Sequence, residues 1–354
     1  MAYTTIDNPG SFFNTVLYTG NGSSNAITGV GFQPDWVWLK NRSTNNSHQL
    51  YDAVRGTTKY LESDNADSEY TSSNGISAFG SDGFTIAGNL TGANNSSNNF
   101  VSWNWLGANG TASNSNGNTA STVSANPTAG FSIVTWTGTG SDTTVGHGLS
   151  SAPEMYVVKN RSDSADWRVG QTVAGNTMTG GNGYYMEWND DKASTNPGSA
   201  TTWGSTPTAP TASVFTVGSN NAHNGSSDNM LAYCFHSVKG FSKIGSYIGN
   251  GNANGTFVYT GFKPAWVMGK ATSREDVWWM YDNKRSTFNP MDDRLMTQAN
   301  SAEGEEWDID YLSNGFKVRT TDAQSNGSGE TYFYMAFAEA PFVTVGTKAA
   351  GTAR

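Results

Sequence analysis

A chain of 354 residues is long enough for two or three domains of about 150 residues each. Its 20 Lys and Arg against 29 Asp and Glu leave a net charge of −9, which excludes a sequence-blind nucleic-acid binder because phosphate contacts need basic side chains. The single cysteine, Cys234, excludes an internal disulfide and a cysteine-rich zinc site. No basic start precedes an apolar run, and no stretch reaches the roughly 18 apolar residues of a membrane span, so we expect neither a secretion signal nor membrane insertion.

Glycine and the aromatic residues are both abundant. The 41 Gly accompany many Asn, Ser and Thr, which is turn chemistry, whereas 17 Phe, 15 Tyr and 12 Trp supply bulk for a core. This combination favours an all-β chain of short strands.

Four landmarks follow one another in the first third of the chain. They are a turn phrase at 18–22 (Tyr-Thr-Gly-Asn-Gly), a proline-led strand at 34–40, a strand at 82–86 and an aromatic closing strand at 100–105. The same four recur in the same order at 136–140, 153–159, 213–217 and 230–235, and again at 247–251, 264–270, 314–318 and 332–337. Such self-similarity predicts three copies of one structural unit.

Side chains alternate across a strand, so each of these strands has two faces. One face of the proline-led strand carries Trp36 and Trp38, and one face of the closing strand carries Val101, Trp103 and Trp105. Large apolar residues hold the corresponding positions in the other copies, and we predict that this face is buried. A lysine ends the proline-led strand in every copy, at positions 40, 159 and 270, where we expect a charge that reaches solvent or pairs locally.

Copies of this size, with short strands between Gly- and Asn-rich turns, are typical of two-sheet antiparallel sandwiches. We predict an all-β fold of three tandem antiparallel β-sandwich modules, of jelly-roll or concanavalin-like type, at residues 1–106, 130–239 and 240–343. Residues 107–129 carry no charge and are rich in Gly, Ala, Ser, Asn and Thr, so we expect a flexible linker that lets the first module swing. We expect a loose tail at 344–354.

Distinctive sequence motifs lie at 31–42, 51–56, 100–105 and 334–342. They resemble virion structural proteins of marine tailed bacteriophages, and the repeat texture extends this resemblance over nearly the whole chain. Such proteins are described as virion, fibre or appendage components, some with a concanavalin-like sandwich. The resemblance therefore implies a location but no catalytic residues. The missing N-terminal anchoring domain of tail fibres favours a short fibre tip, a head-surface protein or a decoration subunit.

Glu306, Asp308 and Asp310 stand at alternate positions, and therefore on one face if this stretch is a strand. Retaining glycosidases need two carboxylates about 5 to 5.5 Å apart, and the spacing resembles that of laminarinase-type glucanases. Those enzymes have Glu at both functional ends, whereas position 310 is Asp, and the other copies have no such row. A solvated acidic strand face is the simpler interpretation, so we predict a protein that is not an enzyme and assign no catalytic residue.

Trp278 and Trp279 point to opposite faces if they lie on a strand, so one of them is a candidate platform for sugar stacking. Oxygen ligands of the kind that calcium prefers lie at 64–69 and 189–191, but neither stretch has the spacing of a known calcium loop. We therefore predict no metal site and no cofactor.

These observations favour a non-enzymatic structural protein on the exterior of a tailed-phage virion, made in the host cytoplasm and acting in assembly and surface contact. It is expected to be a head or tail fibre, an appendage or a decoration subunit. The expected partners are other virion proteins and further copies of the chain in a symmetric oligomer. The alternative is a carbohydrate-binding adhesin that recognises host surface glycans, and a third hypothesis is a glycan hydrolase that uses Glu306 and Asp310.

Overall fold

A computed structural model of the chain describes residues 3–178, 183–196 and 202–343, apart from the side chain of residue 307. Strands hold 43% of the residues and helices 5%, which confirms the all-β prediction. Within the described ranges, every pair of named strands is antiparallel. No helix there is long and apolar enough to cross a membrane. The expected tail at 344–354 lies outside the described residues.

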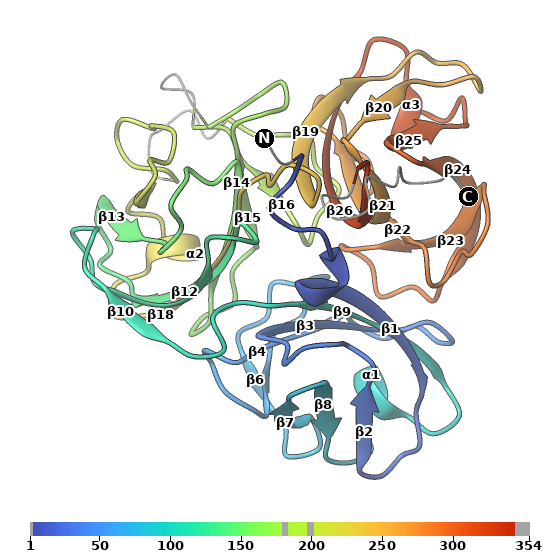
Figure 1. Cartoon of the computed structure of the whole chain (residues 1–354). Helices are drawn as coiled ribbons and strands as arrows, with labels where there is room; N and C mark the ends of the chain where they lie inside the picture. Colours follow the sequence, from blue (N-terminus) through green and yellow to red (C-terminus); the bar gives the residue numbers. More distant parts are fainter. Residues whose placement is uncertain (1–2, 179–182, 197–201, 344–354) are drawn as a thin grey trace.

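Three lobes surround a common centre (Figure 1), and we number them in chain order as lobe 1 (residues 3–106), lobe 2 (107–236) and lobe 3 (237–343). Each lobe has four adjacent strands in one spatial order: a first strand, the closing strand, the proline-led strand and a fourth strand. In that order they are β1 (Phe13–Thr19), β9 (Asn99–Trp105), β3 (Trp36–Asn41) and β4 (Gln49–Asp52) in lobe 1. Lobe 2 has β12 (Phe131–Thr137), β18 (Asn229–Phe235), β14 (Met155–Asn160) and β15 (Arg168–Gln171), and lobe 3 has β19 (Ser242–Ile248), β26 (Thr331–Pro341), β21 (Phe262–Ala271) and β22 (Trp279–Asp282).

The four strands also share one register, which defines equivalent positions in the three lobes. On the proline-led strands, Trp36, Met155 and Trp266 are equivalent. They lie opposite Trp105, Phe235 and Phe337 of the closing strands. The same three residues face, on the fourth strand, Asp52, Gln171 and Asp282. In lobe 3 the strand begins two residues before Pro264, and the register shifts at that proline because it has no N–H to donate to the ladder.

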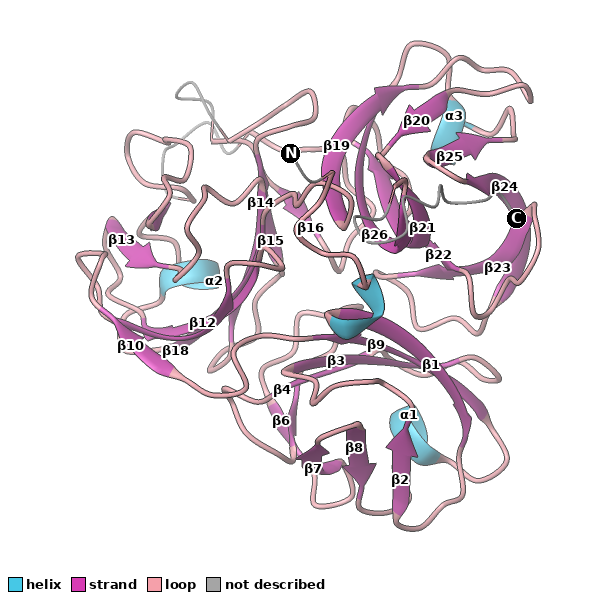
Figure 2. Cartoon of the chain, viewed as in Figure 1, coloured by secondary structure: helices cyan, strands magenta, loops and turns pink. Residues whose placement is uncertain are grey.

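Further strands complete each lobe, either as separate small sheets or as a continuation of the main sheet (Figure 2). Lobe 1 has the sheet β2 (Asn25–Thr28), β8 (Gly83–Ile86) and β7 (Ile76–Gly80), with the pair β5 (Lys59–Tyr60) and β6 (Tyr70–Thr71). Lobe 2 has the pair β13 (Thr143–Gly146) and β17 (Val214–Val217), and β16 (Met186–Glu187) extends its main sheet. In lobe 3 the main sheet continues through β23 (Met291–Met296), β24 (Gly304–Leu312), β25 (Gly315–Val318) and β20 (Phe257–Tyr259). Antiparallel sheets that enclose an apolar interior in every lobe are consistent with a β-sandwich.

A short helix precedes the closing strand in each lobe: α1 (Thr91–Asn94), α2 (Asn221–Asn224) and α3 (Ala323–Asn326). Each ends in a buried Asn whose amide nitrogen donates to two backbone carbonyls at 2.6 to 3.0 Å. The first glycine of each turn phrase lies against the chain that follows this helix. A Cβ at position 20, 138 or 249 would lie 2.0 to 2.3 Å from a backbone oxygen, which explains why the turn phrase keeps its glycine.

The predicted apolar face of each four-stranded sheet is buried, as expected. Trp36, Trp38 and Trp103 have no exposed surface, and Trp105 has 1%. The equivalent residues of all three lobes belong to one apolar cluster at the centre of the molecule. The opposite faces are buried as well, in a separate cluster inside each lobe. Each main sheet therefore lies between a central core that all lobes share and a core of its own.

The prediction of a flexible linker at 107–129 is wrong. These residues form β10 (Ala112–Asn114) and β11 (Ser121–Asn126), and β11 pairs with β12 to extend the sheet of lobe 2. The amide of Gly107 donates to Asp35 of lobe 1 at 2.7 Å, which attaches the start of the segment to that lobe. Strand pairing uses backbone groups, so a segment of small uncharged side chains can still complete a sheet. Lobe 1 is consequently packed on the other lobes and does not swing.

Candidate functional site

The three lobes meet at three seams, and the same backbone contact occurs in each. An amide of one lobe donates to the carbonyl oxygen two residues after the recurring lysine of another lobe. The contacts are Glu69 N to Arg161 O (3.0 Å), Ser194 N to Thr272 O (2.9 Å) and Glu303 N to Arg42 O (3.1 Å). Lobe 1 thus contacts lobe 2, lobe 2 contacts lobe 3, and lobe 3 returns to lobe 1. The ring of equivalent contacts is closed.

The recurring lysines are buried, so they do not reach solvent, which was one of the two expected outcomes. The other, local pairing, is observed, because each donates to a carbonyl oxygen a few residues away. Lys40, Lys159 and Lys270 are all 0% exposed. The ammonium of Lys40 donates to Asn300 O of lobe 3 at 3.1 Å, and that of Lys159 donates to Ala66 O of lobe 1 at 2.9 Å. Burial disfavours the charged form and lowers the pKa of each lysine to about 8.

Four charged side chains form a network at the seam between lobes 1 and 2. Asp52 and Arg55, whose side chains have no exposed surface, pair at 2.5 Å, and Arg55 contacts Glu69 at 3.1 Å. Glu69 also accepts from Arg161 of lobe 2 at 2.8 Å. The hydroxyl of Tyr233, also from lobe 2, donates to Asp52 at 2.9 Å. Burial raises the pKa of Glu69, but the two arginines outweigh burial and hold it below its ordinary value.

The seam between lobes 3 and 1 repeats this network at equivalent positions. Arg285 pairs with Asp282 at 2.5 Å and with Glu303 at 2.9 Å. Glu303 also pairs with Arg42 of lobe 1 at 2.5 Å. The indole nitrogen of Trp103 of lobe 1 donates to Asp282 at 3.0 Å, in the place of the Tyr233 hydroxyl. The two seams therefore share the same arrangement of charged side chains. They differ in the group that donates to the aspartate, which is a tyrosine hydroxyl at one seam and a tryptophan indole at the other.

The seam between lobes 2 and 3 has uncharged residues at all these positions. Gln171 and Ala174 replace the aspartate and its arginine, Ser194 replaces the glutamate, and Thr272 replaces the outer arginine. The neighbouring lobe presents the buried Met335 in place of Trp103 or Tyr233, and a thioether donates no hydrogen bond. Gln171 instead accepts from the amide of Ala174 at 2.7 Å, within its own lobe. The carboxylate is present only where the neighbouring lobe supplies a donor.

Trp278 and Trp279 are both fully buried, so the prediction of an exposed sugar platform there is wrong. Trp278 lies in the central core, and its Nε1 donates to Glu187 O of lobe 2 at 2.8 Å. Trp279 lies in the separate core of lobe 3. Both faces of this strand are covered, so opposite-pointing residues enter two different cores. Trp167 holds the position of Trp278 in lobe 2 and makes the equivalent contact with lobe 1 at 2.8 Å.

His48 holds this same position in lobe 1. Its Nδ1 accepts from Trp38 Nε1 at 2.8 Å, so Nε2 carries the ring proton and donates to Met296 O of lobe 3 at 2.9 Å. Burial lowers the pKa of His48 well below its ordinary value, and the ring is neutral. His48 therefore acts as a hydrogen-bonding member of the seam.

Glu306, Asp308 and Asp310 lie on β24 in three different surroundings. Glu306 has a side chain that is 50% exposed, and Glu306 and Asp310 each pair with an arginine at 3.4 Å. Asp308 is buried and accepts from the hydroxyl of Tyr281 at 3.3 Å, and burial raises its pKa to about 6. The pairing of β24 with β23 shifts register after Met291, which disturbs the simple alternation that the spacing predicts. The row is divided between the interior and the surface of lobe 3.

The two oxygen-rich stretches at 64–69 and 189–191 lie at seams. The backbone oxygen of Ala66 accepts from Ala165 N of lobe 2 at 2.7 Å, and that of Asp191 accepts from Asp276 N of lobe 3 at 2.7 Å. Within the described ranges, no group of three or more His, Cys, Asp or Glu side chains is arranged to hold a metal ion.

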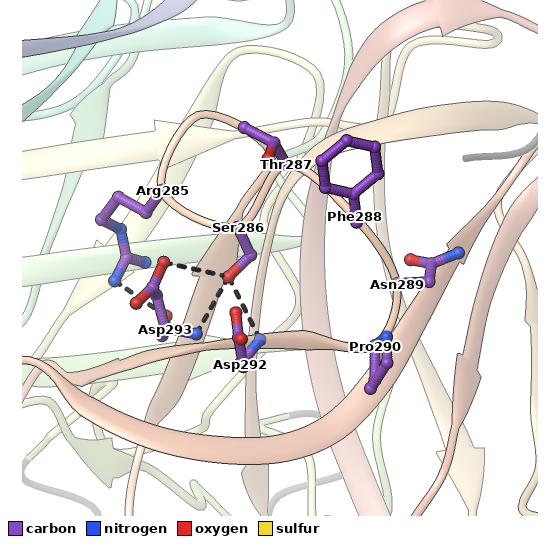
Figure 3. A pocket seen from close by; sticks show the side chains of 8 residues that line it. All are labelled: Arg285, Ser286, Thr287, Phe288, Asn289, Pro290, Asp292 and Asp293. Atoms are coloured by element: carbon purple, nitrogen blue, oxygen red, sulfur yellow. Dashed lines mark hydrogen bonds between the residues drawn. The ribbon is translucent and has the colours of Figure 1, made fainter.

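The loop 285–293 of lobe 3 surrounds an open pocket of about 480 Å³ (Figure 3). The amides at positions 292 and 293 donate to the hydroxyl of Ser286 at 3.1 and 2.9 Å, which closes the base of the loop. The side chain of Asn289 exchanges two hydrogen bonds of 2.8 Å with the backbone of Tyr311. Phe288, at the tip of the loop, is 78% exposed. An apolar ring is thus presented to solvent beside hydroxyl, amide and carboxylate groups.

Residues 8–341 match the family model for a domain of unknown function, DUF7483. The chain belongs to this family. The matched residues run through all three lobes, so the family is defined over the whole three-lobed unit. No curated protein matches the chain.

The loop with Phe288 was not singled out in the sequence, although a comparison of the copies contains a signal for it. Nine positions separate Asp52 from Leu61 in lobe 1, whereas thirteen separate the equivalent Asp282 from Leu295 in lobe 3. The four additional residues lengthen the loop that surrounds the pocket. A length difference between copies of one unit marks a loop that the fold does not need, and such loops frequently carry function.

Proposed function

We propose that this chain is a non-enzymatic structural protein on the exterior of a tailed-phage virion, acting in assembly and surface contact. The observation that carries the proposal is the closed ring of three seams around one core. We interpret the lobes as three tandem β-sandwich modules, of jelly-roll or concanavalin-like type, whose equivalent edges contact one another in turn. The resemblance of the repeat phrases to marine phage virion proteins supports the location.

The central core supports a rigid body. Aromatic rings from different lobes lie in contact, with centroid distances of 4.4 Å between Trp36 and Tyr233 and 4.9 Å between Phe13 and Phe337. Such pairs contribute about 0.5 to 1.5 kcal/mol each beyond the burial of their area. Separating any lobe would expose this core and remove the carboxylate partner of Arg161, of Arg42 or of both. Rigidity of this kind suits a part that transmits contacts within a particle.

The buried ionisable groups support a structural role as well. Arg55, Arg285 and His48 make their hydrogen bonds to partners within the seams or within their own lobe. A buried ion pair adds little net stability over an apolar pair of the same shape, but it penalises wrong arrangements of the lobes. In a wrong arrangement Glu69 and Glu303 lose the arginine of the neighbouring lobe, and Asp52 and Asp282 lose its hydroxyl or indole donor. Such a network therefore favours one relative position of neighbouring lobes.

Electron cryo-microscopy of purified particles tests this proposal. We expect ordered density for all three lobes in symmetry-related copies on the head or tail. Absence of the chain from purified virions, checked by mass spectrometry, would overturn the location. Release of reducing ends from a host polysaccharide, lost in the Glu306→Gln variant, would overturn the non-enzymatic assignment.

A second candidate function, carbohydrate binding, is favoured by one observation: the exposure of Phe288 beside the polar pocket. Aromatic rings stack on sugars, and hydroxyl, amide and carboxylate groups bond their hydroxyls. A host-glycan array probed with the wild-type chain and with Phe288→Ala tests it, with Ile248→Ala as the control because Ile248 is exposed elsewhere in lobe 3. Binding that only Phe288→Ala removes supports an adhesin. Lack of binding by the wild-type chain removes this candidate.

A further inference from the structure

The first strand of the four-stranded sheet is covered in lobe 2 and uncovered in lobe 1. In lobe 2, β11 pairs with β12 over six positions, from Ser121 opposite Trp136 to Asn126 opposite Phe131. In lobe 1, β1 holds the equivalent place, and in the part of the chain that the structure describes it pairs only with β9. Lobe 2 therefore shows that this edge of the fold accepts a further antiparallel strand.

The residues of β1 are typical of an edge that associates. The strand, Phe-Asn-Thr-Val-Leu-Tyr-Thr, contains no charge and no proline, and Leu17 is 38% exposed. Edge strands of soluble proteins are usually protected by lysine, proline or a bulge, because their free N–H and C=O groups pair with other strands. The equivalent of Leu17 in lobe 2 is Thr135, whose hydroxyl bonds the backbone of β11 at 3.4 Å. Lobe 1 has an apolar residue where the covered strand has a polar one.

The first strand of lobe 3 differs from β1 in two respects. β19 carries Lys243, and the hydroxyl of Ser246 donates to Val173 O of lobe 2 at 2.9 Å. A charge and a contact with the neighbouring lobe therefore protect this edge. Ile248, at the end of β19, is 53% exposed and provides a matched site on an edge where we expect no association.

We propose that β1 is a self-association edge, at which β1 of a second copy of this chain pairs antiparallel about a twofold axis. In a twofold dimer, β1 of one copy pairs antiparallel with β1 of the other copy. The dimer therefore needs no second kind of edge. The register of β1 against β9 directs the N–H and C=O of Leu17 to the free edge, so in a pairing centred on the axis Leu17 exchanges both bonds with Leu17 of the second copy. This pairing covers Leu17 and joins two four-stranded sheets into one of eight strands. This inference rests on the proposed structural function and names the partner as another copy.

The expected dimer is weak in solution. Two short strands are expected to bury less than the roughly 1,200 Å² of stable interfaces, as weak, transient contacts do, and we expect a dissociation constant on the order of micromolar or weaker. Copies held close together on a particle meet at a much higher effective concentration, so the same edge is then occupied.

Sedimentation velocity of the full chain over a range on the order of 1 to 100 µM tests the proposal. We expect a monomer–dimer equilibrium that Leu17→Lys weakens about tenfold or more, because two like charges then face each other across the axis. Ile248→Lys adds the same charge to the other edge and leaves the equilibrium unchanged. A wild-type chain that stays monomeric, or equal weakening by both variants, overturns the proposal.

Disulfide trapping gives a second, independent readout. The only native cysteine, Cys234, is buried, so an introduced thiol is the one that reacts. We expect Leu17→Cys to form a covalent dimer rapidly under mild oxidation and Ile248→Cys to remain monomeric. Absence of crosslinking at position 17 contradicts the pairing even if Leu17→Lys fails to fold.

The two proposals can fail separately. Virion density in which β1 faces solvent or another protein would overturn the self-association edge and leave the structural function in place. A chain that dimerises through β1 but is absent from virions would overturn the structural function alone.

Discussion

The variant Arg55→Ala tests whether the charged side chains at the seam between lobes 1 and 2 stabilise the protein only when all of them are present. The side chains of Arg55 and Asp52 are fully buried and 2.5 Å apart, so Arg55→Ala leaves a buried carboxylate without its cation. Removing one partner of a buried pair costs about 3 to 5 kcal/mol. We expect the free energy of unfolding to fall by that amount, a large share of the roughly 5 to 15 kcal/mol that stabilises a typical domain.

The seam between lobes 2 and 3, with uncharged residues at these positions, suggests a variant in which the lost stability is recovered. Gln171, Ala174 and Ser194 hold the equivalent positions in lobe 2, so the triple variant Asp52→Gln, Arg55→Ala, Glu69→Ser copies the lobe 1 side of a seam that the fold already contains, while Arg161 and Tyr233 of lobe 2 stay in place. No carboxylate then remains buried and unpaired. We expect the triple variant to lie within about 1 to 2 kcal/mol of the wild type, the residual loss coming from the hydrogen bonds that Tyr233 and Arg161 no longer make.

Urea unfolding, followed by tryptophan fluorescence and far-ultraviolet circular dichroism, measures these differences. Lys59→Ala is the control, because Lys59 contacts the same Glu69 at 3.6 Å from a side chain that is 42% exposed, and exposed pairs contribute under about 1 kcal/mol. Equal destabilisation of the triple variant and Arg55→Ala would refute the argument from unpaired charge. A loss below about 1 kcal/mol in Arg55→Ala would show that water reaches the seam.

Two further predictions concern single positions. Gly138→Ala should lower the free energy of unfolding by about 2 kcal/mol or more, because its Cβ would lie 2.0 Å from Gly225 O, whereas Gly110→Ala, with open space around it, should change it by less than about 0.5 kcal/mol. Thermal unfolding compares the pair, and equal midpoints would contradict the close approach. Asp308 has a pKa of about 6 in the folded chain against 3.8 when unperturbed, so its contribution to stability is present below about pH 4 and lost as pH rises through 6. Asp308→Asn should therefore be near neutral at pH 4 and stabilising at pH 7 in urea titrations, and an equal effect at both values would contradict a buried carboxylate.

The repeated landmarks were readable in the sequence because they are local. A turn phrase, a proline at a strand start and a two-residue alternation each depend on a few neighbouring residues, and Trp36 and Trp38 lie on the buried face that the alternation predicts. The recurring Asn at the end of each short helix, first seen at Asn94, was equally local and was overlooked.

The linker and the recurring lysines show the limit of local patterns. Residues 107–129 have the composition of a flexible segment, but β12 offers them an unpaired edge, and backbone pairing does not require particular side chains. Lys40 has the pattern of a strand-end charge, yet the carbonyl oxygens that accept its hydrogen bonds include Asn300 O, 260 residues away in the chain. Nothing near Lys40 in the sequence indicates that partner.

The sequence by itself determined the all-β class, the threefold repetition and the faces of the central strands, since periodicity and turn chemistry act over a few residues. Only the tertiary structure decided that the repeats close into a ring, that both faces of the strand with Trp278 are covered, and that Phe288 faces solvent. The reason is physical. Whether a side chain is buried depends on the residues that pack against it, and in the central core those residues come from all three lobes.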